Sequence, residues 1–272
     1  MSDPTAPWAL ALARGLVPFA FGRSTNLDAF DLTPLGVPLR PIAAERPEAA
    51  RFHALLNAMN AAAFGGMGMP AWVQLDLAVL PSAFVGFAAR GADLPPPLRA
   101  RLGAGPDDLT PVAEALCVPS ATPGTWVSVS LASVLPGLGL GLACKLLGLV
   151  ACGARRALGV TQYDNPALRT HTRLGPLVIV EPTVPLHSRP DATFLYEITR
   201  PDIGWHVDPL VGHGAPDILH DPDALQASDT VRSLHAAAVA AGRRLVVLPP
   251  GMWTDASSRR IPLAFFEPRD RD

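Results

Sequence analysis

The longest apolar stretch of the chain covers residues 126–156 and changes its pattern halfway. Trp126–Val134 alternates bulky and small residues, which predicts a buried strand, whereas the residues from Leu142 onward are rich in Leu, Ala and Gly and predict a helix. The two patterns are separated by three alternating glycines, Gly137, Gly139 and Gly141. A strand that passes through such a turn into a helix leaves backbone N–H groups at the helix start for an anion, commonly a phosphate.

Two other interpretations of this stretch stay open. It is long enough to cross a bilayer, because about 20 apolar residues suffice, but the glycines and Pro136 would interrupt the backbone pairing that lipid requires. A single glycine-rich turn is also a weak signal, because glycines equally serve close packing in a buried core. We expect a soluble strand–turn–helix and no membrane span.

The periodicity of the rest of the chain predicts a mixed α/β protein. Strands are predicted at Leu35–Ile42, Ala71–Leu80, Ala83–Ala89, Val112–Val118, Ala157–Tyr163, Leu177–Val180, Thr193–Thr199, Arg244–Leu248 and Ile261–Phe266. Helices are predicted at Glu45–Phe64, from the Asp164-Asn165-Pro166 cap through Arg173, and at Pro222–Ala241. The second and third strands are expected to form a hairpin, and the proline-rich segment Asp93–Asp108 to form a surface excursion.

Composition narrows the class of protein. The chain has 272 residues, of which 49% are apolar, so it can bury a large core. Its net charge is −2 and it has no basic run, so we expect no nucleic-acid partner. Its three cysteines, Cys117, Cys144 and Cys152, lack a metal-binding spacing and predict small buried side chains in a reducing cytoplasm. The N-terminus has no basic region before its apolar stretch, so we predict an arm or short helix there and no signal peptide.

Two motifs and the order of elements resemble the GNAT acyltransferase superfamily. Leu138-Gly139-Leu140-Gly141 is similar to the glycine loop that holds the pyrophosphate of acyl-coenzyme A in that family. The segment from Asp164 to Gly175 resembles its later helix motif, N-x-x-A-x-x-x-Y-x-x-x-G, with Asp164 at the Asn position and His171 at the Tyr position. The chain departs from the pattern at Pro136, where Gln or Arg is usual, and at Pro176, where an aromatic residue is usual.

The resemblance implies a fold, a co-substrate and a reaction. The fold is a GNAT-like, mixed and largely antiparallel sheet flanked by helices over residues 35–200, after an N-terminal arm at residues 1–34. A small C-terminal α/β extension, residues 201–272, is expected to cover one face or to build a homodimer. The reaction is transfer of an acyl group from acetyl-CoA or a longer acyl-CoA to the amine of a small molecule. The implied cofactor-binding residues are Val134, Gly137, Gly139, Leu140, Gly141, Leu142, Asp164 and Asn165.

Three residues are candidates for proton transfer in such a reaction. Glu114 is the only charge in its predicted strand, and burial would raise its pKa toward that of a useful base, although an outward-facing carboxylate is an equally good interpretation. His171 occupies the position of the family's general acid, and an imidazole titrates near neutral pH; the alternative is a half-exposed helix histidine. Tyr163 is a second candidate acid, or a core tyrosine with its hydroxyl at the rim.

Other functions are also open. Lys145, the only lysine, would have a lowered pKa if desolvated and would then form a Schiff base with a carbonyl substrate, unless its ammonium simply extends to water. His206, His213 and His220 recur at intervals of seven, which matches no established ligand pattern, so we predict no metal site. A non-catalytic ligand-binding or interaction protein with the same fold is the main alternative to an enzyme.

Overall fold

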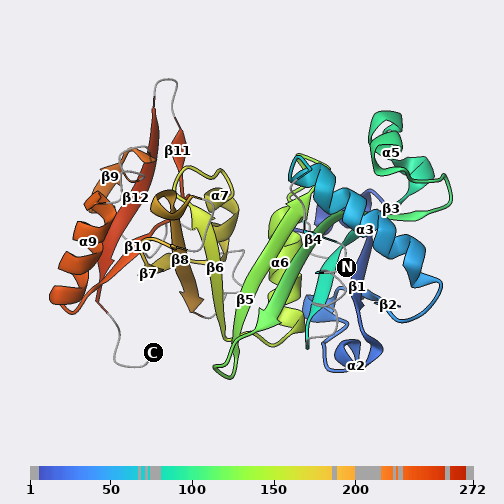
Figure 1. The fold of residues 1–272 in the computed structure, drawn as a ribbon, viewed down its shortest axis with the longest axis horizontal. Helices are drawn as coiled ribbons and strands as arrows, with labels where there is room; N and C mark the ends of the chain where they lie inside the picture. The colour runs from blue at the N-terminus through green and yellow to red at the C-terminus, as the bar shows by residue number, and fades with distance from the viewer. Residues whose placement is uncertain are drawn as a thin grey trace. The chain divides into compact units, whose positions relative to one another are not determined.

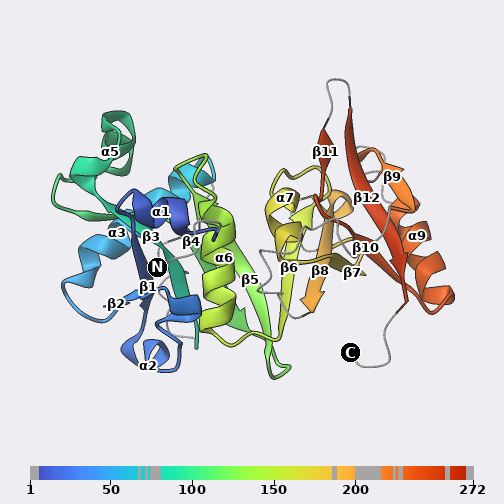
Figure 2. The ribbon, with the colours of Figure 1, turned by 180° about the vertical axis from the view of Figure 1, so that it is seen from behind.

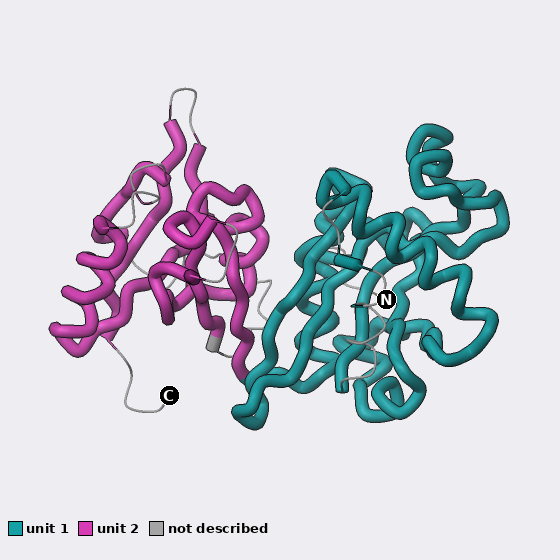
Figure 3. Tube along the Cα trace, viewed as in Figure 1, with its two compact units in different colours: residues 1–155 teal, residues 156–272 magenta. Residues whose placement is uncertain are grey.

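The computed structural model divides the chain into two compact units, residues 1–155 and residues 156–272 (Figure 3). The structure describes residues 6–66, 69–70, 73, 81–185, 189–199, 216–222, 225, 229–254 and 258–267. Each unit is built on a sheet of its own elements and is described by itself. The boundary between them falls inside residues 35–200, the range that the sequence analysis assigns to one domain.

The described residues of the first unit form five strands in the order β2-β1-β3-β4-β5. The strands are β1 (Val17–Gly22), β2 (Arg40–Ala43), β3 (Ala83–Arg90), β4 (Leu109–Pro119) and β5 (Thr125–Ser133). β1 pairs with β2 in parallel, and the other neighbours are antiparallel. The strands predicted from Ala83, Val112 and Trp126 onward are thereby confirmed, and the strand predicted at Leu35–Ile42 is confirmed only in its last part.

β1 corrects the prediction of an N-terminal arm. It lies between β2 and β3, and its burial is nearly complete from Pro18 to Gly22. The proline argued against a strand at this position, because proline cannot donate to a sheet ladder. The register shows how it is accommodated: pairing with β2 begins only at Phe19, one residue after Pro18. Residues 17–22 therefore form an inner strand of the sheet.

Helices cover both faces of the first sheet (Figures 1 and 2). They are α1 (Ala9–Ala13), α2 (Ser24–Leu27), α3 (Ala49–Ala63), α5 (Pro96–Leu102) and α6 (Leu140–Ala151), with short 3-10 turns η1 (Pro34–Gly36) and η2 (Gly91–Asp93). α3 buries the predicted stripe of Phe52, Leu55, Leu56 and Met59 against one face. α6 lies on the opposite face, and all of its 12 residues except Gly141 and Val150 are buried.

Two further predictions in this unit had different outcomes. The segment Asp93–Asp108, predicted as an irregular excursion, contains helix α5. Proline occupies the first helical turn of α5 and Gly103, in the left-handed conformation with φ 64°, ends it, which is the usual asymmetry of helix ends. The strand predicted at Ala71–Leu80, and therefore its hairpin, lies outside the described residues except Val73, which is helical.

The second unit is antiparallel throughout its described strands. Its strands are β6 (Arg156–Gln162), β7 (Leu177–Glu181), β8 (Thr193–Thr199), β9 (Ile218–His220), β10 (Arg244–Val247), β11 (Trp253–Thr254) and β12 (Arg259–Phe266), in the order β6-β8-β7-β10-β12, with β9 and β11 also on β12. Its helical segments are α7 (Leu168–His171), α9 (Asp229–Ala240), η3 (Thr172–Leu174) and η4 (Pro190–Ala192). The predicted strands of this half are confirmed, and β10 joins the residues of the predicted extension to the sheet of β7 and β8.

The predicted helices of the second unit are shorter than expected. The helix after Asp164-Asn165-Pro166 begins only at Leu168 and continues as η3 to Leu174. The helix predicted at Pro222–Ala241 is described mainly as α9, because several residues between Pro222 and Asp229 lie outside the described part. The predicted fold class, a mixed α/β protein with largely antiparallel strands and flanking helices, is confirmed.

Gly86 supplies a test of the sheet packing. A Cβ atom on Gly86 of β3 would lie 2.1 Å from the carbonyl oxygen of Ala113 and 2.7 Å from Cζ of Phe19. Because the first neighbour is backbone, Gly86→Ala is expected to lower the free energy of unfolding by about 1–3 kcal/mol. Chemical denaturation followed by circular dichroism measures this.

Gly148→Ala in α6 is the matched control. A Cβ there would meet Val85 at 3.7 Å and Sγ of Cys117 at 4.0 Å, which are ordinary contacts. The substitution should raise the free energy of unfolding by up to about 1 kcal/mol, the helix propensity difference between Ala and Gly. Equal effects of the two substitutions would contradict the packing described here.

Candidate active site

The glycine turn between β5 and α6 is present as predicted. β5 ends at Ser133, residues 134–139 are irregular, and α6 begins at Leu140. Gly137 and Gly139 both have left-handed backbone, with φ 79° and φ 67°, which residues with a Cβ adopt only at a cost. Leu138 and Leu140 point into the core with 7% and 2% exposure. The glycines between them are exposed, so the backbone of the turn faces solvent.

The start of α6 has unsatisfied backbone donors. Its N-cap residue, Gly139, has no side chain that could accept a hydrogen bond from the first turn, and the first turn contains no acidic residue. The structure gives the amides of residues 137–142 no hydrogen-bond acceptor among the residues it describes. Val134, also predicted to bind the cofactor, differs: its amide donates to the carbonyl of Val112 at 2.9 Å and extends the β4–β5 ladder. The turn and helix start can therefore hold an anion through main-chain amides.

Glu114 lies in the middle of β4 and is fully buried between the sheet and α3. The hydroxyl of Ser130 in β5 donates to its Oε1 at 2.7 Å, and Nδ2 of Asn60 in α3 donates to the same oxygen at 3.1 Å. The second oxygen, Oε2, is buried without a hydrogen-bond partner among the described residues. Because β4 lies between β3 and β5, the interpretation of Glu114 as an edge or outward-facing carboxylate is wrong.

Burial decides the titration of this carboxyl group. Desolvation raises the pKa of Glu114 to about 7, while the hydrogen bonds from Ser130 and Asn60 act in the opposite direction because they favour the ionised form. A carboxyl with this pKa takes up and releases a proton near neutral pH, which is what a general base requires.

The partners of Glu114 were missed in the sequence analysis. Asn60 falls on the apolar stripe of α3, four residues after Leu56, and a polar side chain on a buried stripe is a signal that could have been recognised. Asn60 also contacts the segment after α3: its Oδ1 accepts a hydrogen bond from the amide of Met69 at 2.6 Å. Ser130 carries no such signal, because its contact with Glu114 depends on the register of β5, in which Ser130 pairs with Leu116 and Ala132 pairs with Glu114.

Lys145 lies on the opposite face of the same sheet. It is fully buried in α6, so the interpretation of an ammonium that extends to water is wrong. Burial lowers the pKa of Lys145 to about 7, as the Schiff-base alternative requires, and raises the pKa of the neighbouring Cys117 thiol to about 12. However, a carbonyl substrate would reach this amine only if α6 separated from the sheet, which disfavours that alternative.

The two candidate acids belong to the second unit. Tyr163, just after β6, is fully buried; its ring stacks on Phe194 with centroids 4.4 Å apart, and its hydroxyl donates to the carbonyl of Pro182 at 2.9 Å. Burial raises the pKa of Tyr163. His171 of α7 is 7% exposed, and its ring centroid lies 5.4 Å from that of Tyr196. Two alternative interpretations are therefore wrong. The Tyr163 hydroxyl does not lie at the rim of the core, and His171 is not half-exposed.

Asp164 and Asn165 have structural partners in the second unit. Oδ2 of Asp164 accepts a hydrogen bond from Nη2 of Arg189 at 3.1 Å. Oδ1 of Asn165 accepts one from the amide of Ala167 at 2.9 Å, which orders the turn before α7. Their assignment to cofactor binding stays a prediction.

The structure brings part of the predicted site together within the first unit. The carbonyl of Val112, which holds the start of the glycine turn, belongs to the residue two positions before Glu114, or about 7 Å along β4. Glu114 thus lies two residues along β4 from the residue that holds the start of the glycine turn. Tyr163, Asp164, Asn165 and His171 all lie in the second unit.

Metal and membrane interpretations gain no support from the described part of the chain. No three His, Cys, Asp or Glu side chains are grouped to hold a metal ion among the residues described. His206 and His213 lie outside those residues. None of the described helices is long and apolar enough to cross a membrane.

Comparison with known proteins gives similarity in structure only. No family model matches the chain, and no curated protein matches it. A candidate acetyltransferase of the GNAT family from Desulfovibrio desulfuricans is 18% identical, with a TM-score of 0.37, and the match covers 57% of this chain and 94% of that one. A candidate acetyltransferase from Salmonella typhimurium, solved with its cofactor acetyl-CoA, is 13% identical, with a TM-score of 0.38, over 56% of this chain and 92% of that one.

Glu114 predicts a pH dependence of stability. Its folded pKa of about 7 lies above the ordinary value of 4.5, so the folded state binds more protons than the unfolded state between these values. The contribution of Glu114 to the free energy of unfolding is therefore complete below about pH 4.5, and it is lost as the pH rises to about 7. Glu114→Gln should remove this dependence, and the stability difference between the native protein and the variant should change by about 3 kcal/mol across the window.

Urea denaturation at pH values from 4.5 to 9 measures the effect. Lys145→Met is the control, because the lowered pKa of Lys145 places its own contribution in a different window, where stability rises between about pH 7 and 10.5. A stability difference between native protein and Glu114→Gln that does not change with pH would contradict the buried, titrating carboxyl group.

Proposed function

We propose that this protein is an acyl-CoA-dependent acyltransferase that transfers an acyl group to the amine of a small molecule. The observation that carries the proposal is the exposed glycine turn at the start of α6, whose main-chain amides at residues 137–142 have no acceptor among the described residues. Amides in this arrangement, together with the dipole of a 12-residue helix, suit the pyrophosphate of coenzyme A.

Glu114 supports the chemical part of the proposal. In this reaction the amine nitrogen attacks the thioester carbonyl, a C–N bond forms, the C–S bond breaks, and the amine loses a proton that a base must accept. Glu114 would accept that proton, because its pKa of about 7 keeps it partly ionised and ready to be protonated. Ser130 and Asn60 hold one oxygen, and Oε2 remains for the incoming proton. His171 would return a proton to the departing thiolate, as the family resemblance implies.

A non-catalytic binding protein with the same fold is the second candidate. It is favoured by the complete burial of Glu114 and the small exposed fraction of His171, 7%, because a catalytic group must reach its substrate. Both candidates use the glycine turn for binding and differ only in turnover.

Gly139→Asp tests binding. A Cβ at this position would lie 3.7 Å from the carbonyl oxygen of Pro7, so there is space for a side chain, and Asp tolerates left-handed backbone better than most residues. The added carboxylate should repel a pyrophosphate and abolish binding of acetyl-CoA and longer acyl-CoA in calorimetric titration, while circular dichroism stays unchanged. Gly139→Asn, which has the same shape and no charge, should retain more of the affinity. If the Gly139→Asp variant binds acyl-CoA with unchanged affinity, the glycine turn is not the binding site of the co-substrate.

Glu114→Gln and Ser130→Ala test catalysis. Loss of a positioned base typically costs about 10²–10⁴ in rate, so Glu114→Gln should lower turnover on an amine panel at least a hundredfold, with acyl-CoA affinity changed only a few-fold. Ser130→Ala removes a hydrogen bond that favours the ionised carboxylate, so the rise of the pH–rate profile should move to higher pH. If the native protein binds acyl-CoA without any turnover, or if neither variant changes the rate, the binding protein is the correct candidate.

A further inference from the structure

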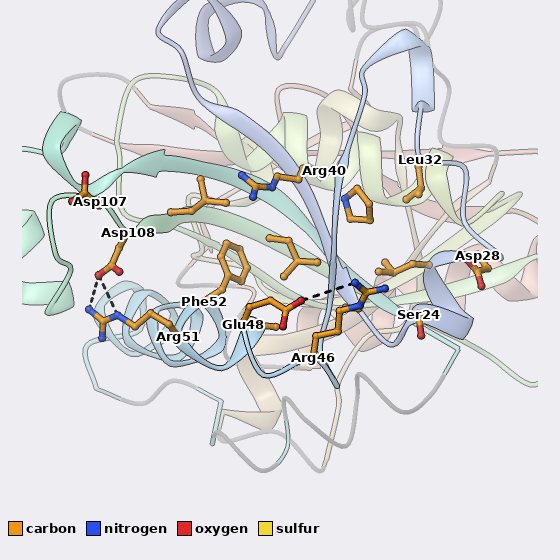
Figure 4. Close-up of a pocket in the computed structure, with 16 residues that line it drawn as sticks. Ser24, Asp28, Leu32, Arg40, Arg46, Glu48, Arg51, Phe52, Asp107 and Asp108 are labelled. Atoms are coloured by element: carbon orange, nitrogen blue, oxygen red, sulfur yellow. Dashed lines mark hydrogen bonds and ion pairs between the residues drawn. The ribbon is translucent and has the colours of Figure 1, made fainter.

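A pocket of about 650 Å³ lies in the first unit, apart from the glycine turn (Figure 4). It is formed where α2, β2, the N-terminal half of α3 and the residues before β4 meet. Its apolar lining consists of Leu27, Leu32, Pro41, Ile42, Ala43, Ala49, Phe52 and Leu109. None of residues 134–142 contributes to it, so its role is separate from that of the turn. The volume is within the range of sites that bind small organic molecules.

Three arginines line this pocket: Arg40, Arg46 and Arg51. Arg51 is held in place, because its Nε and Nη2 donate to Oδ2 of Asp108 at 3.1 and 2.6 Å and its Nη2 also donates to the carbonyl of Gly103 at 2.7 Å. Asp108 is held in turn by the amide of Gly105 at 2.6 Å. One wall of the pocket is thus an ion pair whose two side chains are further held by backbone groups.

Three of the four acidic residues that line the pocket pair with arginines. Asp108 binds Arg51, Glu48 lies 4.0 Å from Arg46, and Asp107 pairs at 3.2 Å with Arg90, which does not line the pocket. Asp28 is exposed at the end of α2 (Figure 4). Arg40 differs from the other two arginines, because no carboxylate of the described residues forms an ion pair with it.

The N-terminal end of α3 lies at this pocket. Arg51 stands in the first turn of this 15-residue helix, and Arg46 comes just before it. Glu48, the N-cap residue, supplies the acidic charge that the positive end of a helix favours, and it lies 4.0 Å from Arg46.

We propose that this pocket binds a small molecule with an apolar body and a single anionic head group, a carboxylate or a phosphate monoester. The guanidinium of Arg40, which lines the pocket (Figure 4), binds the head group. The floor around Phe52 and Ile42 receives the apolar body. This site does not depend on the proposed acyl transfer, because it shares no residue with the glycine turn.

Direct titration of the full chain with eight-carbon probes tests the proposal. Octanoate and octyl phosphate carry the two candidate head groups, and octylamine carries the same body with the opposite charge, all used below their aggregation concentrations. We expect a Kd near or below about 1 mM for at least one of the two anions, with amide shifts in ¹H–¹⁵N spectra confined to the pocket. Octylamine should bind at least about tenfold more weakly. Which of the two anions binds more tightly identifies the head group.

Arg40→Gln and Arg101→Gln form the matched pair of variants. Both remove one exposed arginine charge from the first unit, but only Arg40 lines the pocket. Arg40→Gln should weaken binding of the preferred anion by at least about tenfold, as expected when a hydrogen bond to a charged group is lost, and Arg101→Gln should leave it unchanged. Phe52→Leu, which keeps the core apolar, should weaken the binding of both octanoate and octyl phosphate.

Several outcomes would overturn the site. They are absence of saturable binding by either anion at several times 1 mM, equal binding of octylamine, and equal affinity of the Arg40→Gln variant and the native protein. Because none of these measurements involves acyl-CoA, failure here would leave the proposed acyl transfer untouched, and failure of acyl transfer would leave this site untouched.

Discussion

The packing of α6 against β3, β4 and β5 is the contact on which the first unit depends. A helix that is apolar on almost every side cannot face water, so it needs cover on both its sheet side and its outer side. The N-terminal residues help to provide the outer cover: η1 packs on α6, and the amide of Asp31 donates to the carbonyl of Ala151 at 2.9 Å, at the C-terminal end of the helix. This is why residues predicted as an arm are part of the fold, and why the glycine turn at the other end of α6 has a fixed position.

Two ionisable side chains are buried on opposite faces of the same sheet. Glu114 faces α3 and Lys145 belongs to α6, and burial moves both pKa values to about 7, one upward and the other downward. Burying a full charge in a core is costly, and proton exchange lets each group become neutral instead. Apolar residues of similar size would satisfy packing at lower cost. The retention of a titrating carboxyl group beside Asn60 and Ser130 therefore argues for a role in proton transfer more strongly than for a role in stability.

The charged pocket beside β2 follows a different physical principle from the glycine turn. The turn offers backbone amides whose number and direction are set by the helix start, and such a site suits a phosphate group irrespective of side chains. The pocket combines a guanidinium with apolar side chains from several segments, so its proposed selectivity arises from side chains. The two proposed sites share no residue and can be separated by mutation.

Local patterns in the sequence determined most of the elements and one half of the site. Alternation predicted β3, β4 and β5, the helical stripe predicted α3, and the three alternating glycines predicted the turn before α6, because each of these depends on neighbours along the chain. The lone charge in β4 also drew attention to Glu114 before its burial was known.

Only the tertiary structure decided the remainder. Asn60 and Ser130 meet Glu114 because α3 crosses β4 and because β5 has one particular register, and Arg40 and Arg51 line one pocket although 11 residues separate them. β1 contains Pro18, which lacks an N–H for the sheet ladder, and only the register shows that Pro18 pairs with β3 while pairing with β2 starts at Phe19. The exposure of Tyr163, His171 and Lys145 likewise could not be predicted, because a side chain's access to water is set by what packs over it and not by its neighbours in the chain.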